Sequence, residues 1–151
     1  MRVVSRKKNK TDSAKNEIKR RHHSRSQGKL TVVGIGPGSL DLLTLRAKKA
    51  IRESQVIAGY KTYIELLGNL SKGRELISTG MTQEVERARQ AIDKAKEGYR
   101  VCLVSSGDPG VYGMAGLVLE LLKEDERIKV EIIPGVMASS AGAAILGAPL
   151  M

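Results

Sequence analysis

The feature that most constrains the fold is a regular alternation of short apolar runs with longer segments of helical spacing. Five apolar runs predict strands at residues 30–35, 55–58, 75–78, 100–104 and 129–133. The segments between and after them predict helices at residues 42–52, 62–70, 83–97, 112–123 and 137–146. Strands joined by helical crossovers pair in parallel, and these crossovers are right-handed. The sequence therefore predicts an α/β fold, an open doubly wound parallel sheet of about five strands with flanking helices on both faces.

Glycine-rich turns follow three of the predicted strands. They are Gly34-Ile35-Gly36-Pro37-Gly38, Ser106-Gly107-Asp108-Pro109 and Pro134-Gly135-Val136. The carboxyl ends of parallel strands lie at one edge of the sheet, which is where ligands bind in this class of fold. In the second turn, Gly107 removes a side chain where a ligand could approach the backbone, and Asp108 supplies a carboxylate. Each turn alone is a weak signal, but together they predict a ligand site at this edge.

The first turn does not match the phosphate-binding motifs that it resembles in outline. The dinucleotide fingerprint needs a glycine at position 39, which is Ser39 here, and Pro37 removes a backbone N–H from the turn. The chain also leaves the second predicted strand through Gly59 and Tyr60, without the acidic residue that binds ribose in that motif. A P-loop is excluded because no Gly-Lys-Ser/Thr closes the turn. These observations favour a nucleoside-containing ligand that lacks phosphates.

The net charge of +10 is concentrated in the first 27 residues, which hold ten basic residues and two acidic ones. Residues 28–151 therefore carry a net charge of only +2. Because the first segment has almost no large apolar side chains, burial cannot offset its ordering entropy. We predict a disordered basic tail at residues 1–27 and a single domain at residues 28–151. The tail has two open interpretations, a solvated extension or a loose attachment to nucleic acid or anionic lipid.

Composition argues against several classes of function. The chain has no Phe or Trp and four Tyr, so few rings are available for base stacking. No stretch reaches the ~20 apolar residues that a membrane span needs. The single cysteine, Cys102, is interpreted as a small buried hydrophobe in a reduced cytoplasmic protein, with a catalytic or intermolecular role left open. Residues 28–151 contain no histidine, and no metal site is predicted.

Five blocks of sequence resemble a known family. Residues 33–38 (VGIGPG), 104–112 (VSSGDPGVY) and 133–136 (IPGV) resemble the signature motifs of the tetrapyrrole (corrin and porphyrin) methyltransferases. Residues 56–63 (VIAGYKTY) and 78–88 (STGMTQEVERA) resemble the branch that methylates C17 of precorrin-3B or cobalt-precorrin-3B in cobalamin biosynthesis. The resemblance covers about residues 29–151 and implies S-adenosylmethionine as methyl donor, a precorrin as substrate and a homodimer.

The resemblance also implies a set of cofactor-binding residues by their place in the motifs. These residues are Pro37, Ser106, Gly107, Asp108, Val111, Met137 and Ala138. By this resemblance Pro37 lines the trough for tetrapyrrole and cofactor. Ser106, Gly107 and Asp108 meet the methionine and ribose parts of the cofactor. For Val111, Met137 and Ala138, simple helix packing is the alternative interpretation. The family often has threonine where Met137 stands, which puts a hydroxyl contact there in doubt.

The reaction implied by the resemblance needs little from acids or bases. An electron-rich ring carbon attacks the sulfonium methyl group in line, and alignment with exclusion of water can supply about 7–11 kcal/mol. Methylation in this branch is coupled to ring contraction. No residue is assigned to that step, and Ser39 and Asp41 near the first turn are candidates by position only.

The resemblance covers only the first part of the family's architecture. Members continue into a second α/β domain, with the cofactor in the cleft between the two domains. Because the chain stops at Met151, we expect half a cleft that is inactive alone, binds cofactor weakly and self-associates. A different class of function stays open at this point. It is a non-catalytic module that binds a nucleoside ligand and docks on nucleic acid through its basic tail.

Overall fold

The computed structural model describes residues 28–122, 128–148 and 150. The predicted basic tail at residues 1–27 lies outside the described residues, as does the last residue of the predicted helix 112–123.

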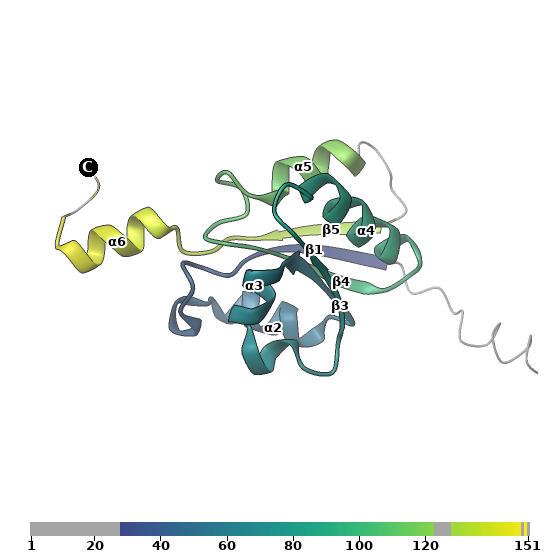
Figure 1. Ribbon diagram of the computed structural model, residues 1–151, viewed down its shortest axis with the longest axis horizontal. Coiled ribbons are helices and arrows are strands. Elements are labelled where there is room, and N and C mark those ends of the chain that lie inside the picture. Colours follow the sequence, from purple (N-terminus) through teal and green to yellow (C-terminus); the bar gives the residue numbers. More distant parts are fainter. Residues whose placement is uncertain (1–27, 123–127, 149, 151) are drawn as a thin grey trace, which may run out of the picture.

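Five strands form one parallel sheet (Figure 1). They are β1 Gly28–Gly34, β2 Val56–Tyr60, β3 Glu75–Thr79, β4 Arg100–Ser105 and β5 Ile128–Ile133. Their order in space is β3-β2-β4-β1-β5, and every pairing is parallel. Val33 of β1 lies in register with Val104 of β4 and with Ile133 of β5. The carboxyl ends of these three strands therefore reach the same edge of the sheet.

Helices cover both faces of the sheet (Figure 1). The helices are α2 Leu45–Glu53, α3 Lys61–Leu66, α4 Glu84–Lys96, α5 Met114–Leu122 and α6 Ala138–Leu146, with short 3-10 helices η1 Leu40–Leu42 and η2 Gly68–Ser71. The chain moves from β1 through β2 to β3 in one direction across the sheet, then returns through β4 to β5. With right-handed crossovers, this reversal puts α2 and α3 on one face and α4 and α5 on the other. The predicted doubly wound α/β fold is confirmed.

Two apolar layers hold the helices to the sheet. Side chains alternate along a strand, so Val32 of β1 packs into the layer under α4 and α5, whereas Val33 packs into the layer under α2 and α3. Both layers are aliphatic, as the composition requires. Cys102 of β4 is fully buried in the second layer, and this burial raises the pKa of its thiol to about 12. The thiol therefore stays protonated at neutral pH and packs as a small apolar side chain, as predicted.

The predicted helix boundaries differ from the observed ones at turns and caps. The expected helix 42–52 is divided, because the hydroxyl of Thr44 accepts a hydrogen bond from the backbone N–H of Ala47 at 3.1 Å and caps α2. The expected helix 62–70 breaks into α3 and η2 near Gly68, whose φ is +50°. The expected helix at 112 begins only at Met114, because Tyr112 has a left-handed φ of +52°.

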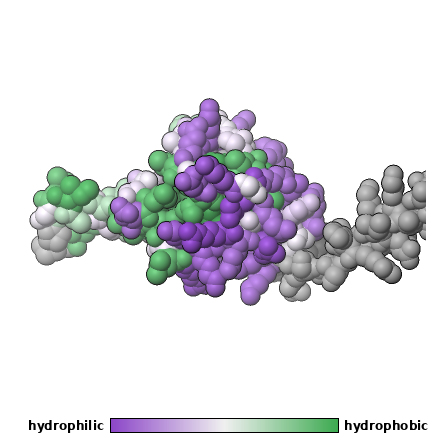
Figure 2. Space-filling view, turned by 90° about the horizontal axis from the view of Figure 1, so that it is seen from below, coloured by the Kyte–Doolittle hydropathy of each residue, from purple (hydrophilic) through white to green (hydrophobic). Residues whose placement is uncertain are grey.

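The last helix, α6, extends away from the rest of the domain (Figure 1). It buries none of its residues, and Ile145 and Leu146 are 85% and 80% exposed. Figure 2 shows apolar side chains gathered at that end of the molecule, while much of the remaining visible face is polar. No helix in the described ranges is both long and apolar enough to cross a membrane.

Candidate functional site

The three glycine-rich turns meet at the carboxyl edge of the sheet. The turns after β1 and β4 are joined by an isolated antiparallel bridge between Gly36 and Gly107. The Gly36 N–H donates to the Gly107 carbonyl at 3.2 Å, and the Gly107 N–H donates to the Gly36 carbonyl at 2.8 Å. The turn after β5 packs on the same place through Gly135. The convergence predicted from the sequence is thus present.

Glycine is required in two of these turns by the closeness of the backbones. A Cβ atom at position 135 would lie 2.1 Å from the Gly107 carbonyl oxygen. A Cβ atom at position 34 would lie 2.5 Å from that same oxygen and 2.7 Å from the Gly135 nitrogen. None of these three distances is compatible with a side chain, because the neighbouring atoms belong to backbone. Gly34 and Gly135 therefore permit the three turns to touch, a role that the sequence analysis did not assign.

Gly107 is a glycine for a different reason. Its φ is +58°, in the left-handed region that residues with a side chain rarely adopt. A Cβ atom there would lie no closer than 3.9 Å to a neighbouring atom of the described chain, the nearest being at Met137 and Val136. The backbone conformation thus favours glycine at this position, and the space beside it is open.

The carboxylate of Asp108 ties the second turn to the third. Its Oδ1 accepts a hydrogen bond from the Gly110 N–H at 2.8 Å, and its Oδ2 accepts one from the Gly135 N–H at 3.0 Å. The sequence predicted a carboxylate directed at a ligand. In the structure both of its oxygens also hold backbone groups, so this side chain organises the site from within.

The other predicted cofactor-binding residues surround this junction. Pro37, Ser106 and Val111 are exposed, and Val111 is 49% accessible. Met137 is half-buried and precedes α6, which begins with the exposed Ala138. The backbone of Met137 and Ala138 passes within about 4 Å of the Cβ position of Gly107, so these residues share one edge.

The two weak catalytic candidates lie in the loop after the first turn. Both Ser39 and Asp41 are exposed. The Ser39 hydroxyl oxygen accepts a hydrogen bond from the backbone N–H of Asp41 at 3.3 Å and caps η1. Ser39 therefore has a local structural role, and the Asp41 carboxylate faces solvent. Among the described residues, no group of three His, Cys, Asp or Glu side chains could hold a metal ion.

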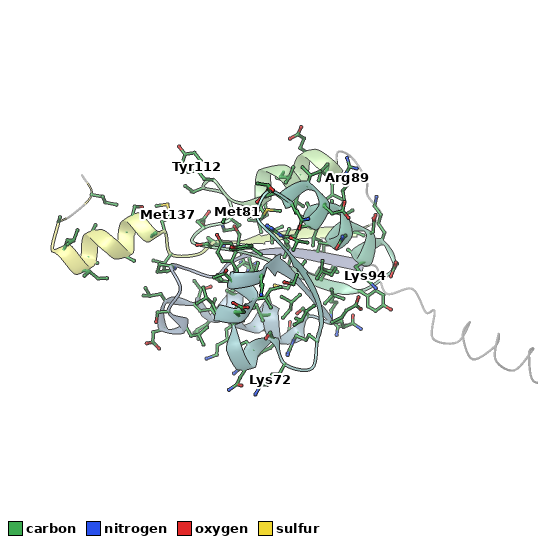
Figure 3. All side chains as sticks on the ribbon, in the orientation of Figure 1. Lys72, Met81, Arg89, Lys94, Tyr112 and Met137 are labelled. Atoms are coloured by element: carbon green, nitrogen blue, oxygen red, sulfur yellow. The ribbon has the colours of Figure 1, made fainter. Side chains whose placement is uncertain are left out.

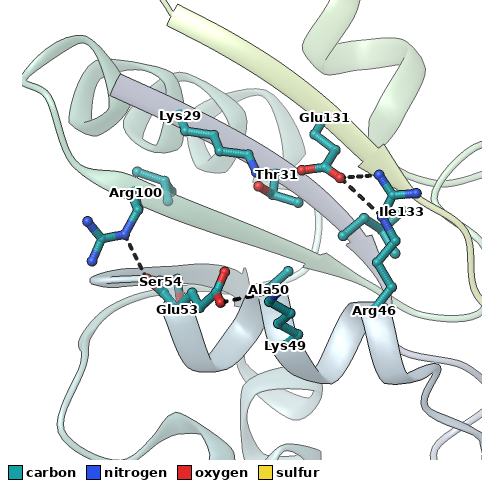
Figure 4. A pocket seen from close by; sticks show the side chains of 11 residues that line it. Lys29, Thr31, Arg46, Lys49, Ala50, Glu53, Ser54, Arg100, Glu131 and Ile133 are labelled. Carbon is teal, nitrogen blue, oxygen red and sulfur yellow. Dashed lines mark hydrogen bonds and ion pairs between the residues drawn. The ribbon is translucent and has the colours of Figure 1, made fainter. Parts of the chain in front are cut away.

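A separate hollow of about 230 Å³ lies on the face of the sheet beside α2 (Figure 4). Charged side chains line it, and Glu131 of β5 pairs there with both Lys29 of β1 and Arg46 of α2. These two cations lower the pKa of the Glu131 carboxyl, mainly by donating hydrogen bonds to the carboxylate. The hollow lies away from the three turns and shares none of the predicted site residues.

A parallel doubly wound sheet with three touching turns at its carboxyl edge is typical of ligand-binding α/β folds, and these turns contain no phosphate loop. The tetrapyrrole (corrin/porphyrin) methylase family matches residues 29–151, and the chain belongs to this family. Among curated relatives, the chain is 51% identical over 130 residues to the cobalt-factor III methyltransferase of Priestia megaterium, covering 83% of this chain and 24% of that protein. It is 49% identical over 123 residues to a probable cobalt-factor III C(17)-methyltransferase of Salmonella typhimurium, covering 81% of this chain and 51% of that protein.

Solved structures agree with the sequence comparisons. The crystal structure of the methyltransferase CobJ superimposes with a TM-score of 0.75 at 41% identity, covering 82% of this chain and 52% of CobJ. The chain thus spans about half of CobJ and of the Salmonella relative, and a quarter of the Priestia protein.

Proposed function

We propose that this chain forms the cofactor-binding half of an S-adenosylmethionine-dependent methyltransferase acting on a corrin precursor in cobalamin biosynthesis. The observation that carries the proposal is the junction of three turns at the carboxyl edge, braced by Asp108. The expected substrate is cobalt-factor III or precorrin-3B, methylated at C17 with ring contraction. The names of the two curated relatives favour the cobalt-containing substrate. They do not favour a non-catalytic module, because both proteins are named methyltransferases.

The geometry supports a division of work among the site residues. Asp108 is held by two backbone N–H groups, and a carboxylate oxygen has a further lone pair that can accept from a ribose hydroxyl. The open space beside Gly107 would admit the cofactor close to the backbone. The exposed Pro37, Ser106 and Val111 would contact the ligands from the rim. Met137 and Ala138 would close the side next to β5.

The chemistry we propose depends on alignment. In methyl transfer a carbon–carbon bond forms between the ring and the methyl group while the sulfur–methyl bond breaks, and its electron pair stays on the neutral thioether. Turns locked by backbone contacts can hold the donor in line with the ring carbon. Such a reaction also requires exclusion of water, which one edge of a sheet does not provide. We therefore propose that a second domain, and a second copy of the enzyme, complete the cleft, with Ser39 and Asp41 as candidates near the ring.

The test begins with binding of S-adenosylhomocysteine to the 151-residue chain by titration calorimetry. We expect measurable affinity for the chain itself and at least a tenfold loss in Asp108→Asn. The substitution replaces one of the two accepting oxygens with an NH2 donor, which cannot accept from the backbone N–H that faces it. The matched control is Asp93→Asn on the exposed side of α4, which should bind like the parent.

Methyl transfer is measured with radiolabelled donor and either cobalt-factor III or precorrin-3B. We expect no turnover from the 151-residue chain alone. A chimera in which this chain is fused to the second half of the Salmonella relative should turn over the substrate. If neither the 151-residue chain nor the chimera binds S-adenosylhomocysteine, the proposed function is contradicted.

A further inference from the structure

Arg87 of α4 is a buried cation that forms an ion pair with no acidic residue in the part of the chain that the structure describes. It is 3% exposed. A buried charge is costly unless its donors are satisfied by hydrogen bonds. The partners of this guanidinium therefore indicate what its burial achieves.

These partners lie in or next to two different loops at the carboxyl edge of the sheet. Nε donates to the Thr79 hydroxyl at 2.7 Å, and Nη2 donates to the Gly80 carbonyl at 2.8 Å, both where β3 leads into α4. Nη1 lies 3.9 Å from the sulfur of Met114, the first residue of α5 after the turn that contains Asp108. One planar side chain thus connects the loop after β3 with the loop after β4.

Both loops present apolar side chains to solvent at their tips. Met81 is 68% exposed, Val111 is 49% exposed, and Tyr112 is completely exposed. Figure 3 shows Met81, Tyr112 and Met137 on the side of the domain from which α6 extends. Large side chains placed this way leave apolar area uncovered, which is typical of a binding surface.

Each loop also contains a residue in an unfavourable backbone conformation. Thr82 has a φ of +66° and Tyr112 a φ of +52°, both in the left-handed region. Such conformations persist when surrounding contacts enforce them. In the first loop Gln83 adds a second restraint, because its Oε1 accepts from the Gly80 N–H at 2.8 Å.

We propose that Arg87 is a positioning residue that braces these two loops, so that Met81 and Tyr112 stand ready to contact the corrin macrocycle. The inference rests on the proposed function and extends it to residues outside the three turns. The planar fork of arginine suits this task, because it reaches acceptors on separate segments in a fixed geometry. Lysine would keep the charge and lose the fork.

The brace is tested first without any ligand, by hydrogen exchange of the 151-residue chain. In Arg87→Met we expect exchange to rise at least tenfold in both residues 79–83 and residues 109–115, while β1 and β4 stay protected. The matched control is Arg74→Met. Arg74 also has three hydrogen-bond partners, in its case the backbone carbonyls of Ile51, Lys72 and Arg52. It lies before β3, at the opposite end of that strand.

Two outcomes of this experiment would overturn the brace. One is faster exchange in only one of the two loops, and the other is the same pattern in both arginine variants. Should Arg87→Met fail to fold, Arg87→Lys is measured instead, with a smaller rise expected in the same two loops.

A binding experiment then tests the link to the substrate. Binding of cobalt-factor III is followed by visible absorbance. We expect about tenfold weaker binding of this corrinoid in Arg87→Met and an intermediate loss in Arg87→Lys. The affinity of either variant for S-adenosylhomocysteine should change less than threefold. Met81→Ala should reproduce the corrinoid loss at an unchanged melting temperature, because the side chain is exposed. Equal loss for both ligands, or no loss of corrinoid affinity, would refute the positioning role. A parent chain that binds neither ligand would count against the proposed function, and the exchange result would still decide the brace.

Discussion

At the scale of single residues, the candidate site depends on backbone atoms that only glycine allows to meet. Gly34 and Gly135 let three turns touch, Gly107 supplies a left-handed conformation in one of them, and the Asp108 carboxylate joins two of them. The contacts are between backbone groups, so they offer a ligand a rigid surface with little conformational entropy left to lose on binding. Substitution at these glycines should therefore affect folding and binding together.

We expect Gly135→Ala to lower the free energy of unfolding by about 3 kcal/mol, because its Cβ atom would lie 2.1 Å from a backbone carbonyl oxygen and force the turns apart. Urea denaturation followed by circular dichroism measures the change. Gly116→Ala is the control, since Gly116 lies in α5 with no atom within 4 Å of its Cβ position. That variant should be more stable than the parent by about 0.5–1 kcal/mol. Similar losses in the two variants would contradict the packing of the three turns.

At the scale of elements, β1, β5 and α2 are joined by a small charge cluster. Glu131 of β5 pairs with Lys29 of β1 and with Arg46 of α2, on a part of the sheet that α2 leaves open (Figure 4). β5 is an edge strand that pairs only with β1 among the described strands. The cluster therefore helps to hold the edge strand, and with it the third glycine turn, in register.

The two cations lower the pKa of Glu131 in the folded protein, which makes the stability of this cluster depend on pH. A carboxyl with a depressed folded pKa stabilises the fold fully above its unfolded pKa, and this stabilisation disappears as the pH falls through the folded pKa. We expect Glu131→Gln to cost about 1 kcal/mol at pH 7 and almost nothing once the carboxyl is protonated in the folded parent protein. Urea denaturation at pH 7 and at successively lower pH measures the difference.

The matched control for the cluster is Glu53→Gln. Glu53 pairs with Lys49 at 3.8 Å on α2, and both side chains are mostly exposed. This variant should change stability by less than about 0.5 kcal/mol at any pH. A constant cost of Glu131→Gln across the whole pH range would show that its effect is not electrostatic.

At the scale of the whole molecule, α6 is an element whose residues the rest of the described domain leaves unburied. It carries small residues and two large apolar ones, and none of its residues is buried. The chain spans 24% and 51% of the lengths of two relatives, and we propose that further protein packs around this helix.

We expect the 151-residue chain to self-associate through α6 in solution, because the uncovered apolar surface favours contact with another copy. The double substitution Ile145→Ser with Leu146→Ser should shift the sedimentation coefficient toward that of a monomer without changing the melting temperature. Leu45→Ser is the comparison, because Leu45 is 86% exposed but lies on α2. A parent chain that sediments as a monomer at high concentration would disprove the expectation.

The sequence by itself determined the order of the elements, the parallel sheet and the edge at which its glycine turns lie. It could do so because strand and helix periodicity is local and because parallel strands place their ends together. It also identified the family, since each of the five motifs is a continuous stretch of sequence. The buried Cys102 was predictable for the same local reason, because it lies within an apolar strand.

Only the tertiary structure decided which atoms meet at that edge. The strand order places Gly34 beside Gly107 and Gly135. The carboxylate of Asp108 accepts a hydrogen bond from the N–H of Gly135, a residue 27 positions away in the sequence. The burial of Arg87 depends on the packing of α4 against α5, and the amphipathic pattern of residues 83–97 gave no sign of it. Contacts of this kind join segments that are distant along the chain, and local patterns of residue type carry no record of them.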